Sequence, residues 1–390
     1  MSTKTFTKKP KEEKPVLAIC YDFDRTLSPD DMQAQGYIQS VGYDVESFWK
    51  ESNALAENNE MDQNLAYMYK MVEESEGRLW MTKEKLAEYG ARVSLFPGVI
   101  DWFERIRLYG VERDVIVEHY IISSGLKEMI EGTLMAKNGA FERIYASSFY
   151  FNHRGVAKWP AQVINYTNKT QFLFRIEKGV LDINDQGVND FCSPEDVRVP
   201  FRNIVYIGDS DTDIPCMKVV NSRGGHSIGV YNADTKDKTK VYKMMRDERV
   251  RYFAAADYTE GSELDHLVKA IICRTAQNEE LERIHYVCKK ENMDDDKKNT
   301  HVKKAKTNAI IALENSRSFA TTHTVVRELK KQKIWRKDER EQLYAIALSN
   351  SQVACILCDA DIRSFYEKLL EKESETSENV RQLKRILDLP

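Results

Sequence analysis

The chain has 390 residues, of which 42 % are hydrophobic, and a formal net charge of −4. This length exceeds that of one typical domain, so we expect two or more domains, and the net charge is too small to indicate a class of partner. The sequence has no apolar run of about 18 residues, which excludes a transmembrane helix.

Residues 1–15 are polar and Lys-rich (MSTKTFTKKPKEEKP) and lack the apolar segment of a secretory signal. We expect them to form a short disordered tail. The seven cysteines have no regular spacing, which is typical of free thiols in a reducing compartment and predicts a cytoplasmic protein. Cys355 and Cys358 have metal-ligand spacing, but no second pair or nearby histidine completes a site. We therefore expect these two side chains to pack in an apolar core.

Three continuous apolar runs have the length of strands that are buried on both faces of a parallel sheet. They are Val16–Tyr21, His119–Ile122 and Ile204–Ile207. The alternation around 141–152 predicts a hairpin with its turn at 152–155, and further strands are expected at 227–230 and 252–256. Because helical patterns separate these runs, the chain is predicted to form an α/β fold with a Rossmann-like parallel sheet.

Two segments interrupt or follow this α/β pattern. Residues 30–95 have helical periodicity and form a predicted helical cap inserted into the core, which comprises 16–29 and 96–275. Residues 276–390 contain no glycine and only the terminal proline, and they predict an all-α C-terminal module that follows a polar linker near 294–300.

Polar side chains follow each of the three buried strands. The clusters are Asp22/Asp24/Thr26, Ser123/Ser124 and Asp209/Asp211/Asp213. The carboxyl ends of parallel strands line one crevice, so these side chains are expected to gather there. Carboxylates that lie close together repel one another unless a cation is present, and an oxygen-rich acidic site suits Mg²⁺.

These motifs resemble those of the haloacid dehalogenase superfamily, in particular its phosphoserine-phosphatase-like members with a helical cap. Asp22-Phe-Asp24-Arg-Thr26 matches the first motif, Ser123 the second, and Gly208-Asp209 with Asp213 the fourth. Lys169, which precedes a predicted helix, is the preferred match to the third motif over Lys158. Phe96-Pro-Gly-Val99 resembles the usual lead-in to the helix before the second motif. The resemblance covers about residues 16–275.

The resemblance implies a phosphatase in which Asp22 is the nucleophile and Asp24 the general acid and base. Its implied Mg²⁺ ligands are Asp22, the backbone carbonyl of Asp24, Asp209 and Asp213. The implied phosphate-binding residues are Thr26, Ser123, Ser124, Gly125 and Lys169. A single aspartate after a strand is often only a turn or helix-cap residue, and this simpler interpretation suits Asp211. Three such positions in family order favour the catalytic interpretation.

A cap that closes over the crevice favours a small phosphorylated metabolite as substrate. Aromatic residues of the cap either line the pocket or, as we expect, pack in the core: Trp49, Tyr67, Tyr69 and Trp80. Arg25 departs from the small or polar residue common in the family, and its side chain is placed to narrow the site or to contact substrate.

The C-terminal module allows several interpretations. Between Lys297 and Arg340 there are thirteen basic residues against four acidic ones, a composition that can bind nucleic acid. Over 276–390 the basic residues number 22 and the acidic ones 20, which favours a module for homo-oligomerisation or protein docking. If the module binds nucleic acid, we expect the enzyme to act on nucleic-acid or nucleotide ends. A regulatory binding protein without catalysis is a third alternative, against which the intact set of motif residues argues.

Overall fold

The structure is a computed structural model that describes residues 6–209, 211–235, 237–298, 303–332, 334–371, 373 and 377–389. The chain divides into two compact units, residues 1–281 and 282–390. Every helix within the described ranges is too short or too polar to cross a lipid bilayer.

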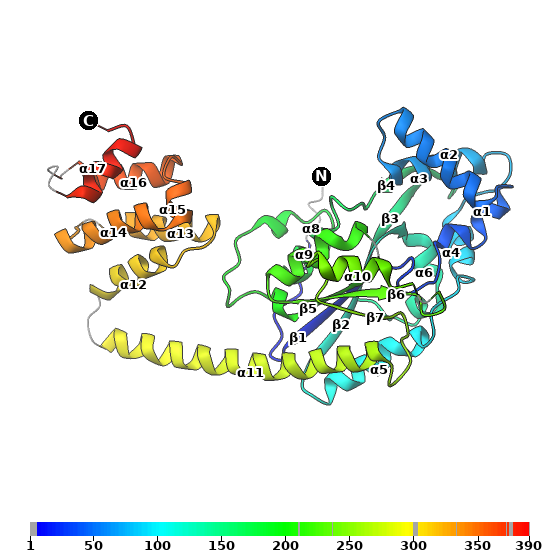
Figure 1. Ribbon diagram of the computed structural model, residues 1–390, viewed down its shortest axis with the longest axis horizontal. Helices are drawn as coiled ribbons and strands as arrows, with labels where there is room; N and C mark the ends of the chain where they lie inside the picture. The colour runs from blue at the N-terminus through cyan, green and yellow to red at the C-terminus, as the bar shows by residue number, and fades with distance from the viewer. Residues whose placement is uncertain are drawn as a thin grey trace. The chain divides into compact units, whose positions relative to one another are not determined.

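A sheet with the strand order β4-β3-β2-β1-β5-β6-β7 forms the centre of the first unit (Figure 1). β3 and β4 pair in antiparallel fashion, and all other neighbours pair in parallel. The strands are β1 Val16–Tyr21, β2 Ile116–Leu126, β3 Arg143–Phe151, β4 Ala157–Gln162, β5 Ile204–Gly208, β6 His226–Tyr231 and β7 Tyr252–Ala255. This mostly parallel sheet confirms the predicted α/β class and the predicted hairpin.

Helices cover both faces of the sheet (Figure 1). Leu17 and Ile19 of β1 belong to a core that includes residues of α5 and α11, and Ala18 and Cys20 belong to a second core with α8 and α9. The main helices of this unit are α5 Val99–Val111, α6 Lys127–Gly132, α7 Leu134–Lys137, α8 Thr170–Lys178, α9 Ile214–Ser222, α10 Thr239–Arg246 and α11 Glu263–Lys298. A strand whose successive side chains enter two cores is apolar throughout, and this explains the continuous apolar runs.

Four helices occupy the segment 30–95, as its periodicity predicted: α1 Tyr37–Ser40, α2 Val45–Asn58, α3 Gln63–Ser75 and α4 Lys83–Gly90. Asp62 caps α3 by accepting hydrogen bonds from the amides of Asn64 and Leu65, and Asn165 donates to its other carboxylate oxygen at 2.7 Å. The side-chain amide of Asn64 donates to the carbonyl of Ile164 at 2.9 Å. These hydrogen bonds therefore connect the start of α3 to the segment that leads to Lys169.

The N-terminal segment was expected to be disordered, but from residue 6 onwards it is described and lies on the core. The amide of Lys9 donates to the carbonyl of Gly179 at 2.9 Å, and its ammonium group lies 2.6 Å from Glu118. Arg198 lies between Glu12 and Glu118 in the same network. Long-range ion pairs hold this polar segment, and its local composition gives no sign of them.

The second unit has an apolar core of its own. Its helices are α12 Lys303–Glu314, α13 Phe319–Lys330, α14 Lys337–Ser349, α15 Ser351–Cys355, α16 Ala360–Leu370 and α17 Glu378–Ile386. The linker predicted near 294–300 is wrong over its first part, because α11 continues to Lys298; residues 299–302 lie outside the described residues. Cys355 and Cys358 are exposed, so the prediction that they pack in the core is also wrong.

Candidate active site

Asp22 follows β1 directly, and its amide donates to the carbonyl of Ile207 in β5 at 3.0 Å. The chain then turns tightly, because the amides of residues 26–28 all donate to the carbonyl of Phe23 at 2.9–3.2 Å. Arg25 occupies this turn in the left-handed region, with φ of 58°. The turn keeps Asp24 and Thr26 close to the end of β1, where Asp22 lies.

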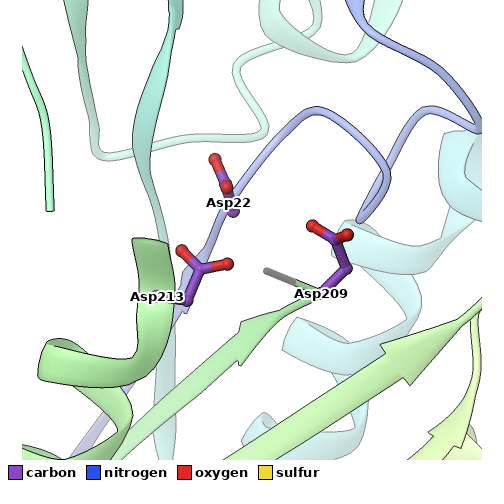
Figure 2. A group of neighbouring side chains, drawn as sticks. All are labelled: Asp22, Asp209 and Asp213. Carbon is purple, nitrogen blue, oxygen red and sulfur yellow. The ribbon is translucent and has the colours of Figure 1, made fainter. Parts of the chain in front are cut away.

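Three aspartates from different elements meet beyond the ends of β1 and β5. Asp22 follows β1, Asp209 follows β5, and Asp213 immediately precedes α9 (Figure 2). Each offers a carboxylate oxygen, and these oxygens lie within 4.8 Å of one another. All three residues are buried, with exposed fractions of 6 %, 9 % and 0 %. The structure thus brings together three of the four predicted metal ligands through their side chains.

Burial and mutual repulsion change the acidity of this cluster. Burial raises the pKa of Asp209 to about 7, and the charges of Asp213 and Asp22 add to this against the opposing effect of Lys240. Burial also raises the pKa of Asp22, and Asp213 contributes in the same direction. The ionised carboxylates therefore repel one another in a space with little water, and a cation would stabilise them.

Lys169 is the cation that the structure places in this cluster. It is fully buried, and its ammonium group lies 2.7 Å from Asp213 Oδ1 and 3.1 Å from Asp22 Oδ2. Burial alone would lower the pKa of Lys169, but the charges of Asp213 and Asp22 outweigh burial and raise it. The alternative Lys158 is half exposed and pairs with Glu76 at 3.6 Å, so the geometry favours Lys169.

Asp24 lies apart from the three clustered carboxylates. Its Oδ1 accepts a hydrogen bond from the amide of Met32 at 2.8 Å. Burial raises the pKa of Asp24 well above its ordinary value, and the charges of Asp31 and Asp22 add to this effect. A raised pKa favours the protonated form of the carboxyl group, which suits a proton donor.

The last residues of β2 lie beside these aspartates, because the strand continues to Leu126, past the predicted end at Ile122. Ser123 is buried, its Oγ accepts from the amide of Gly125 at 3.1 Å, and it also hydrogen-bonds Asp22. A Cβ atom at Gly125 would lie 2.3 Å from Met32 Cε and 2.8 Å from Asp24 Oδ2, so a larger residue at this position would displace these side chains. Among the described residues, the hydroxyls of Ser124 and Thr26 are buried without a hydrogen-bond partner. The predicted phosphate-binding residues therefore lie in the turn after β1, in the last residues of β2 or at the start of α8.

A sequence model of haloacid dehalogenase-like hydrolases matches residues 19–218, just over half of the chain. The chain belongs to this family. The matched segment contains all the predicted site residues. A curated "uncharacterized protein" of Borreliella burgdorferi is 28 % identical over 295 residues, covering 67 % of this chain and 98 % of that protein.

Solved structures similar to this haloacid dehalogenase-like hydrolase are distant in sequence. A family hydrolase of Salmonella enterica serovar Typhi is 16 % identical, with a TM-score of 0.45 and coverage of 67 % of this chain and 73 % of that chain. A substrate-bound phosphoserine phosphatase is 16 % identical, with a TM-score of 0.41 and coverage of 66 % and 99 %. Cytosolic 5'-nucleotidase IIIB bound to cytidine is 16 % identical, with a TM-score of 0.42 and coverage of 68 % and 87 %.

The donor set of this hydrolase fits a hard divalent cation. Three buried carboxylates supply oxygen ligands from separate elements, and carboxylate oxygens with water are the ligands that Mg²⁺ prefers. Two cations offset the negative charge of the cluster, Lys169 within it and the half-exposed Lys240, 3.4 Å from Asp209.

Two residues of the site were not predicted. Lys240, at the start of α10, contacts Asp209, and no motif pointed to it because α10 is distant in sequence from the other site residues. The hydroxyl of Tyr206 in β5 donates to Asp213 Oδ1 at 2.8 Å. Tyr206 lies in the apolar run that precedes Gly208-Asp209. Its position on one face of the predicted strand was the only feature of the sequence that pointed to the site.

Proposed function

We propose that this hydrolase is a Mg²⁺-dependent phosphatase that cleaves a phosphomonoester through an aspartyl-phosphate on Asp22. The observation that carries the proposal is the position of the Asp22 carboxylate, 3.1 Å from the buried ammonium group of Lys169. A nucleophile for a phosphoryl group needs a nearby positive charge to overcome repulsion by the phosphoryl oxygens. Asp24, two residues away, adds a carboxyl group whose raised pKa favours the protonated form.

In the first step, a carboxylate oxygen of Asp22 forms a bond to phosphorus while the bond from phosphorus to the alcohol oxygen breaks. The electron pair of the broken bond goes to the alcohol oxygen, and Asp24 gives its proton to that oxygen. Lys169, Ser123 and the amides of Ser124 and Gly125 bind the phosphoryl oxygens, and Thr26 supports the loop that carries Asp22 and Asp24.

In the second step, ionised Asp24 accepts a proton from a water molecule whose oxygen attacks phosphorus. The bond between phosphorus and the Asp22 oxygen breaks, which releases inorganic phosphate and restores the carboxylate. Because Asp24 gives a proton in the first step and takes one in the second, each cycle ends with both aspartates in their starting states.

The residues that would hold Mg²⁺ are Asp22, Asp209 and Asp213, together with the backbone carbonyl of Asp24. The bound ion would supply positive charge that offsets the phosphoryl oxygens and orients them for in-line attack. Support for this comes from the three carboxylates within 4.8 Å of one another and from the raised pKa of Asp209.

We further propose a small phosphorylated metabolite as the substrate and the cytoplasm as the compartment. Support for a small substrate is the burial of the acidic cluster and the contact of a cap residue with the end of β2, since Tyr67 donates to the carbonyl of Ser124 at 2.8 Å. Support for a reducing compartment is that all seven cysteines are free.

The C-terminal unit is proposed as a docking module for a second copy or a partner protein. Four of the eight basic residues of 297–340 whose side chains are described form ion pairs within this unit, which leaves fewer charges for nucleic-acid phosphates. The pairs are Lys306–Glu339 at 3.3 Å, Lys331–Glu328 at 2.6 Å, Arg336–Glu339 at 3.2 Å and Arg340–Glu373.

A phosphate-release screen of the full chain tests the proposed function. The panel holds phosphorylated metabolites, nucleotides and oligonucleotides with terminal phosphates, each with Mg²⁺ and with EDTA. We expect Mg²⁺-dependent release from small phosphomonoesters. Turnover that persists in EDTA would contradict the proposed Mg²⁺ dependence. Phosphate release from oligonucleotides alone would contradict a small metabolite as substrate and favour nucleic-acid ends.

A further inference from the structure

Met32 lies where the chain passes from the core into the cap. It begins the 3₁₀ helix Met32–Ala34, which precedes α1, and its side chain is fully buried. The other end of the cap segment lies close by, because the amide of Phe96 donates to the carbonyl of Leu27 at 2.9 Å. Met32 therefore belongs to the connection between cap and core.

The backbone of Met32 holds the proposed proton donor. Its amide donates a hydrogen bond to Asp24 Oδ1 at 2.8 Å. An ion pair closes the loop between these two residues, since the guanidinium group of Arg25 lies 3.0 Å from Asp31 Oδ2. Arg25, which departs from the common family pattern, thus pairs with the residue that directly precedes Met32.

The sulfur of Met32 joins the same loop to the end of β2. Met32 Sδ accepts a hydrogen bond from the amide of Leu126 at 3.2 Å. The strand is irregular here, because its register against β3 shifts between Ile122 and Leu126. A thioether is a weak acceptor, and in this position it adds a contact where the sheet is least regular.

Met32 and Asp24 also meet at a glycine of β2. A Cβ atom at Gly125 would collide with both Met32 Cε and Asp24 Oδ2, so these two side chains lie over the glycine. The amide of Gly125 is one of the proposed ligands of the phosphoryl oxygens. Met32 therefore contacts both the proton donor and the end of β2 where the phosphoryl group is proposed to bind.

We propose that Met32 is a positioning residue, which fixes the Asp24 carboxyl group relative to the end of β2 through its amide and its sulfur. The inference rests on the proposed phosphatase function and deepens it by adding a residue that acts through Asp24. A proton donor acts only when it lies within hydrogen-bond reach of the leaving oxygen. A displaced Asp24 therefore slows substrates that need its proton and has little effect on those that do not.

The test uses the full chain with Mg²⁺ and two substrates, 2-hydroxyethyl phosphate and para-nitrophenyl phosphate. Met32→Leu removes the sulfur but keeps the amide and nearly the same volume, so the fold should be retained. Its kcat/KM should fall about tenfold for the alkyl phosphate, as expected for one lost hydrogen bond, and by less than about threefold for para-nitrophenyl phosphate. Met32→Pro also removes the amide, at a helix start where proline is tolerated, and should enlarge the loss for the alkyl phosphate.

Met71→Leu is the matched control, because Met71 is equally buried in the same apolar core. It should change kcat/KM by no more than about twofold for either substrate. A double-mutant cycle then measures the coupling between Met32 and Asp24. In the Asp24→Asn background, Met32→Leu should change kcat/KM for the alkyl phosphate by less than about twofold.

An equal loss for both substrates in Met32→Leu would overturn the inference and leave the phosphatase proposal intact. The same holds for unchanged kcat/KM in Met32→Leu, or for a full tenfold loss in the Asp24→Asn background. If Met32→Pro does not fold, Met32→Leu and the cycle decide. Wild-type release of phosphate from neither compound above an Asp22→Asn background would remove both proposals.

Discussion

The ammonium group of Lys169 lies 2.7 Å from Asp213 Oδ1, and both side chains are fully buried. The hydroxyl of Tyr206 donates to the same oxygen at 2.8 Å, and Asp22 lies on the other side of the ammonium group. One cation thus neutralises two interior carboxylates from separate elements. This arrangement links the stability of the fold to the chemistry of the site.

Replacing Lys169 by Met should therefore reduce both stability and activity. Removing one partner of a buried ion pair leaves an uncompensated charge, with an expected loss of about 3–5 kcal/mol in the free energy of unfolding. Urea denaturation measures this loss, and added Mg²⁺ should restore part of it. Lys158→Met is the control, since that half-exposed lysine should change stability by no more than about 0.5 kcal/mol. Equal effects of the two substitutions would contradict the assignment of Lys169.

Asp24→Asn should slow the enzyme most for substrates with poor leaving groups. A basic alkoxide needs the proton of Asp24, whereas a stable phenolate leaves without it. We expect a loss of about 10²–10⁴-fold in kcat/KM for an alkyl phosphate and a much smaller loss in kcat/KM for para-nitrophenyl phosphate, because kcat/KM reports the first step, in which the alcohol leaves. Asp30→Asn, in the exposed part of the same loop, serves as the control. Parallel losses for both substrates would argue against proton donation by Asp24.

The metal-free protein should lose stability as pH rises from about 4 to about 7. The folded-state pKa of Asp209 is raised to about 7 from an ordinary value of 3.8, so the folded protein binds this proton more tightly than the unfolded chain does. The stabilisation that protonation provides is complete below the unfolded-state pKa and disappears as pH passes the folded-state pKa. Its size is on the order of 4 kcal/mol.

Thermal unfolding at several pH values, with EDTA and with Mg²⁺, measures this linkage. Mg²⁺ favours the ionised carboxylates, so its stabilising effect should grow across the same pH range. Asp209→Asn should reduce both the pH dependence and the response to Mg²⁺, while Asp211→Asn, exposed two residues away, should change neither. A Mg²⁺ response that Asp209→Asn leaves unchanged would place the metal elsewhere.

Much of this site could be predicted from the sequence because the chemistry follows short, strongly apolar strands. Asp22 and Asp209 directly follow runs that enter two cores, and a parallel sheet brings such strand ends together. Lys169 could be preferred over Lys158 because a well-formed helix follows it. These signals are local in the sequence, and the fold class determines where the residues lie in space.

The remaining contacts depend on packing between distant segments. Lys240 reaches Asp209 from α10, and Tyr67 reaches Ser124 across 57 positions of the chain. The ion pairs of Lys9 with Glu118 and Glu142 likewise hold a segment whose composition indicates disorder. Neither periodicity nor spacing encodes which polar side chain will find which partner, so such contacts were visible only in the structure.

The most direct test of the proposed mechanism is to locate the phosphoryl group in the covalent intermediate. Asp24→Asn lacks the base for the second step, so it should accumulate the intermediate during turnover of para-nitrophenyl phosphate. Acid quenching followed by peptide mass spectrometry should then show the mass of one phosphoryl group on Asp22 and none in the Asp22→Asn, Asp24→Asn double variant. A phosphoryl group on any other residue, or full turnover by Asp22→Asn, would contradict nucleophilic catalysis by Asp22.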